Sequence, residues 1–491
     1  MEPARHHAHR TMRPASADAA FPFPSVGPRR HDPAAVAAVA QALTPLAADG
    51  LRLLVKPKEC RRLSRDAYDY SPVLAARLAA AEAELVVCPV TVEQVEAVAA
   101  ACAQRRVPIT MRGAGTGNYG QAVPLLGGVL LTMTGLRTVR SASGDCVTAE
   151  AGCRLVAVDE VLASHGVEQR LLPSTYRTAT IGGFVAGGSG GIGSMGWGFL
   201  RDPGNVLGME IVTVEPHPRR HQLTGDAAAP LNHAYGTNGI MVALTMPTAP
   251  LHRWQELLVA VSDLDHGLAL AEQLRRMALP IKELSLYDQR IAAMVRPMRG
   301  GATQDGGCRL IAVVAMEALE TVKTHLRRHK ARLLVRRPQT MAGSLRELTW
   351  NHTTLHARAN DPAWTYLQLL LPPEPAAVLR TLSRQQGDGL AWHLEAVRSG
   401  GEARWAALPL LRWNGAAALA AVMETARNLG CTLFNPHVVT VEDGGLGVVD
   451  RDQVQAKRAY DPAGLLNPGK LRGWLEWEAS GQGSAGPLMG G

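Results

Sequence analysis

Two glycine-rich tracts constrain the fold of this 491-residue chain more than any other feature. The first, Arg112–Gln121, contains four glycines within eight residues and directly follows the apolar stretch Val107–Met111. The second runs from Gly182 to Gly198. Glycine lets the backbone adopt positive φ and approach a ligand closely, and successive N–H groups can then bind an anion. Arg112 adds a charged partner for phosphate. A glycine-rich turn without a ligand is the alternative for the first tract.

Segments typical of strands and helices flank both tracts. Leu85–Cys88 predicts a short buried strand, and Thr91–Gln94 matches a capping box that begins a helix reaching Arg105. With Val107–Met111 as the next strand, this unit should be a right-handed parallel crossover. Glycine-rich loops that line one cleft suit a large cofactor with a pyrophosphate. Further strands are predicted at Val129–Met133, Val147–Ala151 and Met209–Thr213, and a further helix over Leu155–Ser164.

Both tracts contain a formal G-x-G-x-x-G, at Gly115–Gly120 and Gly188–Gly193. A dinucleotide-binding Rossmann fold needs a helix that begins directly at this motif. The first motif continues instead toward Pro124, a poor helix start, and no convincing strand precedes the second. We therefore interpret both matches as false positives for an NAD site.

Composition and charge exclude several other classes. A hydrophobic fraction of 46% excludes a wholly disordered chain, and no stretch of about 18 residues is both apolar and uncharged, so no transmembrane segment is expected. The seven cysteines are scattered without a C-x-x-C pair, which indicates reduced thiols and a cytoplasmic location. Residues 1–66 carry 11 Lys/Arg against 6 Asp/Glu, so most of the net +8 lies there. Without a folded basic stripe, we expect no nucleic-acid binding.

Five segments in order resemble the FAD-binding domain of the vanillyl-alcohol oxidase / PCMH superfamily, and within it the flavin subunits of glycolate oxidase and D-lactate dehydrogenase. The resemblance implies an α+β fold: a PCMH-type FAD-binding domain of two subdomains, plus an α+β substrate (cap) domain, after which the chain returns to the FAD domain. The five segments are Cys88–Val95, Arg112–Gly117, Thr180–Gly183, Val206–Thr213 and Asp461–Lys470.

The resemblance also implies domain boundaries. We expect a disordered basic arm, a helical segment, the FAD domain, the cap, a C-terminal segment that completes the FAD domain, and a flexible tail. These cover residues 1–32, 33–84, 85–250, 251–430, 431–471 and 472–491 in that order.

The same resemblance implies which residues bind FAD. The first loop would bind the pyrophosphate, a second wall would face it, the tract at Ser189–Gly196 would lie close to the flavin, and two strand residues would lie near the adenine. The expected residues are Arg112, Gly113, Ala114, Gly115, Thr116, Gly117, Asn118, Gln121, Pro173, Ser174, Thr180, Gly182, Gly183, Ser189, Gly191, Gly196, Ile211, Val212 and Asn467. Some relatives bond FAD to a histidine of the first loop; none lies between Arg112 and Gln121, so we predict noncovalent FAD.

Three histidines are candidates for a catalytic base. In the resembled family a Trp-led segment of the cap reaches the active site, so His352, two residues after Trp350, is the first candidate, with a buried structural histidine as the alternative. His393 is a weaker candidate of the same type. His352 and His356 share a helical face, but the glutamate of H-E-x-x-H is absent, and we predict no metal site.

Many relatives carry Glu-His-Gly near the end of the chain, where this sequence has Glu442-Asp443-Gly444. The missing histidine puts a metal-assisted 2-hydroxy-acid mechanism in doubt, and His437 could replace it only if the chain bends suitably. In the cap, Leu319–Leu334 predicts a basic helix, either a solvated face or a docking surface for an acidic electron-transfer partner.

These observations predict an FAD-linked oxidoreductase that moves a hydride from an alcohol or a 2-hydroxy-acid-like small molecule to flavin N5. An NAD-dependent Rossmann dehydrogenase and a non-catalytic flavin-binding subunit are the alternatives. The sequence leaves open the electron acceptor (oxygen, a quinone, a cytochrome or a flavoprotein) and whether the chain forms an oligomer.

Overall fold

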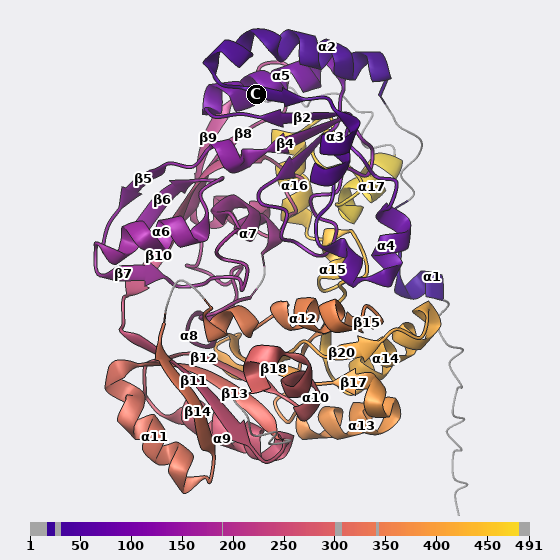
Figure 1. Cartoon of the computed structure of the whole chain (residues 1–491). Helices are drawn as coiled ribbons and strands as arrows, with labels where there is room; N and C mark the ends of the chain where they lie inside the picture. Colours follow the sequence, from indigo (N-terminus) through magenta and orange to yellow (C-terminus); the bar gives the residue numbers. More distant parts are fainter. Residues whose placement is uncertain (1–16, 25–30, 189, 300–306, 340–342, 481–491) are drawn as a thin grey trace, which may run out of the picture.

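The computed structural model describes residues 17–24, 31–188, 190–299, 307–339 and 343–480 (Figure 1). Within these residues the strands form four sheets. Two sheets belong to the upper half of the molecule in Figure 1, which carries the glycine-rich tracts, and the other two belong to the lower half.

The first sheet contains the predicted strand–helix–strand unit. Its order is β1-β2-β4-β3, and both β2 and β3 pair in parallel with β4, which confirms the parallel crossover. Helices α2, α3 and α4 come from the segment that precedes β2. That segment was predicted to be helical only, but its strand β1 pairs antiparallel with β2. The elements are α2 (Pro33–Leu43), β1 (Arg52–Leu54), α3 (Pro57–Leu63), α4 (Pro72–Leu78), β2 (Leu85–Cys88), α5 (Val92–Arg105), β3 (Ile109–Arg112) and β4 (Val129–Thr132).

Helix α5 begins as its sequence predicts. The Thr91 hydroxyl accepts a hydrogen bond from the Gln94 backbone N–H at 3.3 Å, and the Gln94 side chain accepts one from the Val90 N–H at 2.7 Å. The first contact satisfies an N–H group that the first turn of a helix leaves without a partner, and the second ties the residue before the N-cap to the same turn. The capped helix then leads into β3, and the first glycine-rich tract begins at the end of that strand.

The second sheet is antiparallel, in the order β5-β6-β10-β8-β9, with β7 also paired to β10. The long strand β10 pairs with β6, β7 and β8, so it holds this subdomain together. The elements are β5 (Val139–Ala142), β6 (Cys146–Glu150), α6 (Leu155–Ala163), β7 (Val167–Gln169), α7 (Ile181–Gly187), α8 (Ser194–Trp197), β8 (Gly208–Val212), β9 (Arg220–Thr224) and β10 (Ile240–Pro250).

The cap is built on an eight-stranded sheet, in the order β14-β11-β13-β12-β18-β19-β16-β21, and on a small sheet β15-β20-β17. The elements are β11 (Trp254–Val261), α9 (Leu264–Arg276), β12 (Ile281–Tyr287), α10 (Gln289–Met294), β13 (Cys308–Ala315), α11 (Leu319–Arg328), β14 (Arg332–Pro338), α12 (His352–Asn360), β15 (Trp364–Tyr366), β16 (Gln368–Leu370), α13 (Ala376–Gln386), β17 (Leu390–Ala391), β18 (His393–Ser399), β19 (Glu402–Ala407), β20 (Leu410–Arg412), α14 (Ala416–Asn428) and β21 (Thr432–Phe434).

Two boundaries of the cap differ from the prediction. The basic helix expected over Leu319–Leu334 ends at Arg328, because Lys330 adopts φ of 55° and the edge strand β14 follows. The cap sheet also extends past residue 430, since β21 pairs with β16.

After β21 the chain returns to the half that carries the glycine-rich tracts, through α15 (Val441–Gly444), α16 (Arg451–Tyr460) and α17 (Arg472–Ala479). The Asn467 N–H donates to the Ile109 carbonyl of β3 at 2.7 Å. The flexible tail predicted from residue 472 is wrong for α17, because Trp474 is buried. Residues 481–491 of that tail lie outside the described residues.

The N-terminal arm predicted as disordered also has a described part. Helix α1 (Ala17–Ala20) precedes Phe21, whose side chain is buried in the core of the cap. Arg77 donates to the Phe21 carbonyl at 2.6 Å. Residues 1–16 and 25–30 lie outside the described residues.

A buried ion pair joins the two halves. The Lys282 ammonium of β12 lies 2.8 Å from the Glu168 carboxylate of β7, and the Trp254 indole N–H donates to the same carboxylate at 3.0 Å. Only 4% and 8% of the two charged side chains are exposed, so each needs the other as its counter-ion.

Candidate cofactor site

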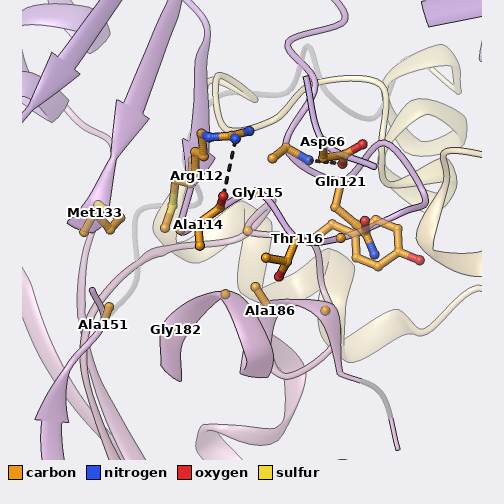
Figure 2. Close-up of a pocket in the computed structure, with 18 of the residues that line it drawn as sticks. Asp66, Arg112, Ala114, Gly115, Thr116, Gln121, Met133, Ala151, Gly182 and Ala186 are labelled. Carbon is orange, nitrogen blue, oxygen red and sulfur yellow. Dashed lines mark hydrogen bonds between the residues drawn. The ribbon is translucent and has the colours of Figure 1, made fainter. Parts of the chain in front are cut away.

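A cavity that is partly open to solvent lies where the first glycine-rich tract meets α7 (Figure 2). The lining comes from the end of β3 and its loop, from α7, and from the segment that leads into β10. The lining residues are Asp66, Met111, Arg112, Gly113, Ala114, Gly115, Thr116, Gly117, Gln121, Ala122, Met133, Ala151, Gly182, Gly183, Ala186, Gly187, Tyr235, Gly236 and Met241.

The two walls of the cavity touch at Gly113. A Cβ atom at this position would lie 2.3 Å from the Thr180 hydroxyl oxygen and 3.5 Å from the Gly183 Cα. Thr180 is the N-cap of α7, and its hydroxyl accepts from the Gly183 N–H at 3.2 Å. A side chain at Gly113 would separate the walls, so glycine here keeps the loop and the helix in contact.

Arg112 lies at the mouth of the first loop. Its guanidinium donates to the Arg65 carbonyl at 2.7 Å and to the Ala114 carbonyl at 3.4 Å. Burial lowers the pKa of Arg112, while Asp66 opposes that change. Arginine nevertheless stays charged in proteins, so the cavity contains a cation that can pair with a phosphate.

Asp66 and Lys470 hold the far end of this loop. The Asp66 carboxylate accepts from the Tyr68 and Ala122 N–H groups at 3.0 and 3.3 Å, and burial raises its pKa to about 6. The Lys470 ammonium donates to the Gln121 and Val123 carbonyls at 3.2 and 3.0 Å, and burial lowers its pKa to about 7. Asp66, which precedes the first glycine-rich loop in the sequence, and Lys470, which follows it by some 350 residues, therefore both hold this loop in place.

The structure brings about half of the predicted cofactor residues together. Of these, the cavity is lined by Arg112, Gly113, Ala114, Gly115, Thr116, Gly117, Gln121, Gly182 and Gly183. Thr180 contacts the lining, and Asn467 lies behind it, donating to the Gln121 and Tyr235 carbonyls at 2.8 and 2.7 Å. Residues that do not line the cavity are Asn118, Pro173, Ser174, Gly191, Gly196, Ile211 and Val212. Ser189 lies outside the described residues.

Two of the histidines proposed as bases are fully buried and engaged at both ring nitrogens. His393 Nε2 lies 2.6 Å from Glu395 Oε1, and its Nδ1 lies 2.7 Å from the Thr353 hydroxyl. His437 Nδ1 lies 2.7 Å from the Ser71 hydroxyl, and its Nε2 donates to the Tyr366 carbonyl at 2.9 Å. Burial lowers the pKa of His393 to about 3 and that of His437 to about 4. Neither lines the cavity, and each would have to break a bond to act as a base.

His352 is different. Its Nδ1–H donates to the Glu347 carbonyl at 2.6 Å, which leaves the lone pair of a neutral ring on Nε2. Burial lowers the pKa of His352, so this neutral form dominates at pH 7. Like the other two histidines, its ring does not line the cavity, and neither do Glu347 and Tyr176, whose hydroxyl donates to the Glu347 carboxylate at 3.1 Å.

Glu442 has a structural environment rather than a metal-binding one. Its buried carboxylate accepts from the Arg472 and Gly473 N–H groups, each at 2.8 Å, at the start of α17. Among the described residues, no three or more His, Cys, Asp or Glu side chains are grouped to hold a metal ion. In the same residues, no helix combines the length and apolarity that crossing a membrane requires.

Sequence reasoning missed several lining residues. Tyr235 and Gly236 lie in a segment rich in glycine, which was a usable signal, whereas Asp66 is more than 45 residues before the first tract and its segment carries no motif. The fit to a large phosphate-bearing cofactor rests on the glycine-lined walls, which a Cβ at Gly113 would force apart, and on Arg112 beside them.

Comparison with known proteins places this geometry in context. A family described as "FAD binding domain" matches residues 83–216. The glycolate oxidase subunit GlcD of Escherichia coli is 35% identical over 161 residues, which cover 32% of this chain and 29% of GlcD. A D-lactate dehydrogenase of Archaeoglobus fulgidus is 34% identical over 156 residues, covering 30% and 34% of the two chains. This chain therefore matches only about a third of each relative's length.

An uncharacterized FAD-linked oxidoreductase of Mycobacterium tuberculosis is 25% identical over 226 residues, covering 44% of each chain. A solved structure of alkyldihydroxyacetonephosphate synthase superposes with a TM-score of 0.68 at 16% identity, over 90% of this chain and 86% of that one. That likeness extends through the cap and confirms the predicted α+β architecture.

Proposed function

We propose that the chain is an FAD-dependent oxidoreductase acting on a CH–OH donor, on the premise that residues 83–216 match a family described as "FAD binding domain". The substrate would be a small alcohol or 2-hydroxy acid, the class named for glycolate oxidase subunit GlcD and D-lactate dehydrogenase. The glycine-lined cavity with Arg112 in its wall is the observation that carries the proposal.

Each wall would have a separate task in binding. Arg112 and the backbone of its loop would bind the pyrophosphate, and Gly182 and Gly183 would face it from α7. The lining residues include neither histidine nor cysteine, which supports noncovalent FAD. Acid precipitation tests this point, because a covalent flavin would leave the pellet yellow.

The chemistry would divide between cofactor and protein. When bound, FAD supplies the hydride acceptor. His352 is the side chain we assign to the hydroxyl proton of the substrate, since its Nε2 carries a lone pair and its Nδ1 is fixed by the Glu347 carbonyl. Loss of hydride from carbon and of the proton to His352 would convert the CH–OH group to a carbonyl.

The visible spectrum of the purified protein is the first test, because oxidised flavin absorbs at roughly 375 and 450 nm. Anaerobic addition of alcohols and 2-hydroxy acids should then bleach the longer-wavelength band. His352→Gln should slow bleaching about 100-fold or more, as expected for a lost general base, while Lys323→Gln on exposed α11 should not. Unchanged bleaching in the His352 variant would refute its role as the base.

A second candidate function is a flavin-binding subunit without substrate oxidation of its own. The missing Glu-His-Gly histidine favours it, as does the use of Glu442 as a structural acceptor for α17. Flavin that is reduced by light but by no member of the substrate panel would decide for this candidate.

A further inference from the structure

Trp350 has an unusual backbone conformation for its residue type. Its φ is 52°, in the left-handed region that bulky side chains rarely adopt. Such strain persists only where surrounding contacts impose it, and it is concentrated at functional sites. Trp350 lies two residues before α12, on the side of the cap that meets the FAD-binding half.

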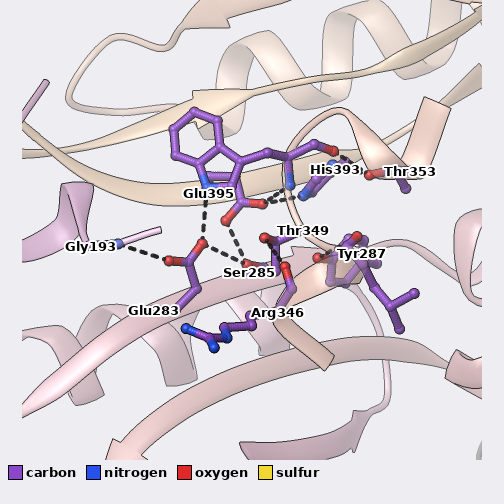
Figure 3. Close-up of polar contacts among 11 residues, drawn as sticks. Gly193, Glu283, Ser285, Tyr287, Arg346, Thr349, Thr353, His393 and Glu395 are labelled. Atoms are coloured by element: carbon purple, nitrogen blue, oxygen red, sulfur yellow. Dashed lines mark hydrogen bonds and ion pairs between the residues drawn. The ribbon is translucent and has the colours of Figure 1, made fainter. Parts of the chain in front are cut away.

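Two buried carboxylates impose this conformation (Figure 3). The Trp350 backbone N–H donates to Glu395 Oε1 at 2.7 Å, and its indole N–H donates to Glu283 Oε1 at 3.1 Å. Ser285 lies between the carboxylates, 2.5 Å from Glu395 and 3.5 Å from Glu283. The exposed fractions of Glu283 and Glu395 are 4% and 0%, so water does not compete for these contacts.

The hydrogen bonds around His393 place a proton on the cluster formed by Glu283, Ser285, His393 and Glu395. The Thr353 hydroxyl donates its single hydrogen to the Trp350 carbonyl at 2.7 Å, so its oxygen must accept from His393 Nδ1–H. Burial keeps His393 neutral by lowering its pKa, and Nε2 is then an acceptor. The Glu395 carboxyl, 2.6 Å away, must therefore supply the hydrogen, and the cluster holds Trp350 from both its N–H and its C=O.

The same cluster also binds the second glycine-rich tract. Glu283 Oε2 accepts from the Gly193 N–H at 3.2 Å, so one carboxylate binds both the indole and the tract. A Cβ at Gly190 would lie 2.7 Å from the Trp350 ring and 2.8 Å from the Phe199 ring. Gly187, at the end of α7, lines the cavity three residues earlier. The Trp350 indole thus packs against Gly190, in the tract that follows α7.

We propose that Trp350 is a positioning residue for the cofactor. Its indole, held by Glu283 and Glu395, fixes the tract at Gly190–Gly193 and thereby the wall against which FAD binds. The proposal rests on FAD binding, as the proposed function does, but it requires no oxidation of substrate. A tryptophan that merely filled space in the cap would affect stability without affecting FAD.

The test compares two tryptophans of the cap. Trp350→Phe and Trp392→Phe each remove one indole N–H bond, to Glu283 at 3.1 Å and to the Ser383 hydroxyl at 2.8 Å, but Trp392 lies in the cap core. We expect Trp350→Phe to raise the Kd of the apoprotein for FAD roughly tenfold, the upper end of the effect of one hydrogen bond, and to change the flavin circular dichroism. Trp392→Phe should leave both within about twofold, although both variants lower the melting temperature.

An FAD Kd for Trp350→Phe within twofold of wild type, with an unchanged flavin spectrum, would overturn the proposal. If Trp350→Phe does not fold, Ser285→Ala provides the test one contact further away, with an expected rise in Kd of roughly threefold and the same refuting result. Failure of the proposed function would give a different result. The wild-type protein would bind FAD normally, but no hydroxy acid or alcohol would bleach the flavin absorbance.

Discussion

Glu395→Gln should remove a large part of the pH dependence of stability in the cap. Burial raises the pKa of Glu395 from its ordinary 4.5 to about 7, and the Glu283 carboxyl is shifted in the same direction by burial and by Glu395. The folded protein therefore keeps a proton that the unfolded chain releases. Stability contributed by this group is complete below pH 4.5 and is lost as the pH rises through 7.

The size of the effect follows from these values. One pKa unit corresponds to about 1.4 kcal/mol, so the folded state should lose about 3 kcal/mol between pH 4.5 and pH 8 on account of Glu395. For a folding unit of the size of the cap, this corresponds to a fall in melting temperature of roughly 6–12 °C. Glutamine is neutral at every pH and keeps one acceptor oxygen for the Trp350 N–H, so the variant should be less stable at pH 5 but should lose less on going to pH 8.

Differential scanning calorimetry of wild type and Glu395→Gln at several pH values between 5 and 8 measures this directly. Carboxylates common to both proteins cancel in the difference between the two curves. The exposed Glu402 of β19 supplies the control, because Glu402→Gln should follow the wild-type curve. Parallel wild-type and Glu395→Gln curves over this range would show that the Glu395 carboxyl is not protonated in the folded protein, and the reasoning would be wrong.

Three further substitutions test other parts of the structure. Arg112→Ala should weaken FAD binding roughly 10- to 100-fold in a fluorescence titration of the apoprotein, as expected for a charge-assisted bond to phosphate. Equal FAD affinity of the variant and the wild type would show that Arg112 does not bind the cofactor. Lys282→Met should cost about 3–5 kcal/mol in urea unfolding by leaving Glu168 buried without a counter-ion, whereas Lys323→Met, at an exposed pair, should cost less than about 1 kcal/mol. Lys470→Met should lower FAD affinity by releasing the carbonyls of the first loop, and wild-type affinity would contradict that role.

The sequence predicted those parts of the fold whose structure depends on residues close to one another in the chain. The capping box at Thr91 and the strand before Arg112 depend on residues within one turn or one strand, and both are found as expected. The first glycine-rich tract lines the cavity, a position that its own glycine content indicated.

The errors concern residues whose role depends on distant partners. Asp66 reaches the cavity from a segment without a motif, and Lys470 acts on a loop some 350 residues earlier. His437 looked like a possible base, but a serine from α4's N-cap and a carbonyl from β15 occupy both its nitrogens. The helical nature of residues 472–479 was missed because the partner that buries Trp474 is not visible in the local sequence.

The anchoring of the first loop by Asn467 and Lys470 sets an order for biosynthesis. A ribosome synthesises the glycine tract long before it reaches these two residues, and during that interval the Gln121 carbonyl has neither of its later donors. Domains generally fold as units during synthesis, from the N-terminus onward. The cap therefore emerges from the ribosome before residues 467–470, which complete the preceding domain. Acquisition of the cofactor is then expected to be a late event that follows the synthesis of these residues.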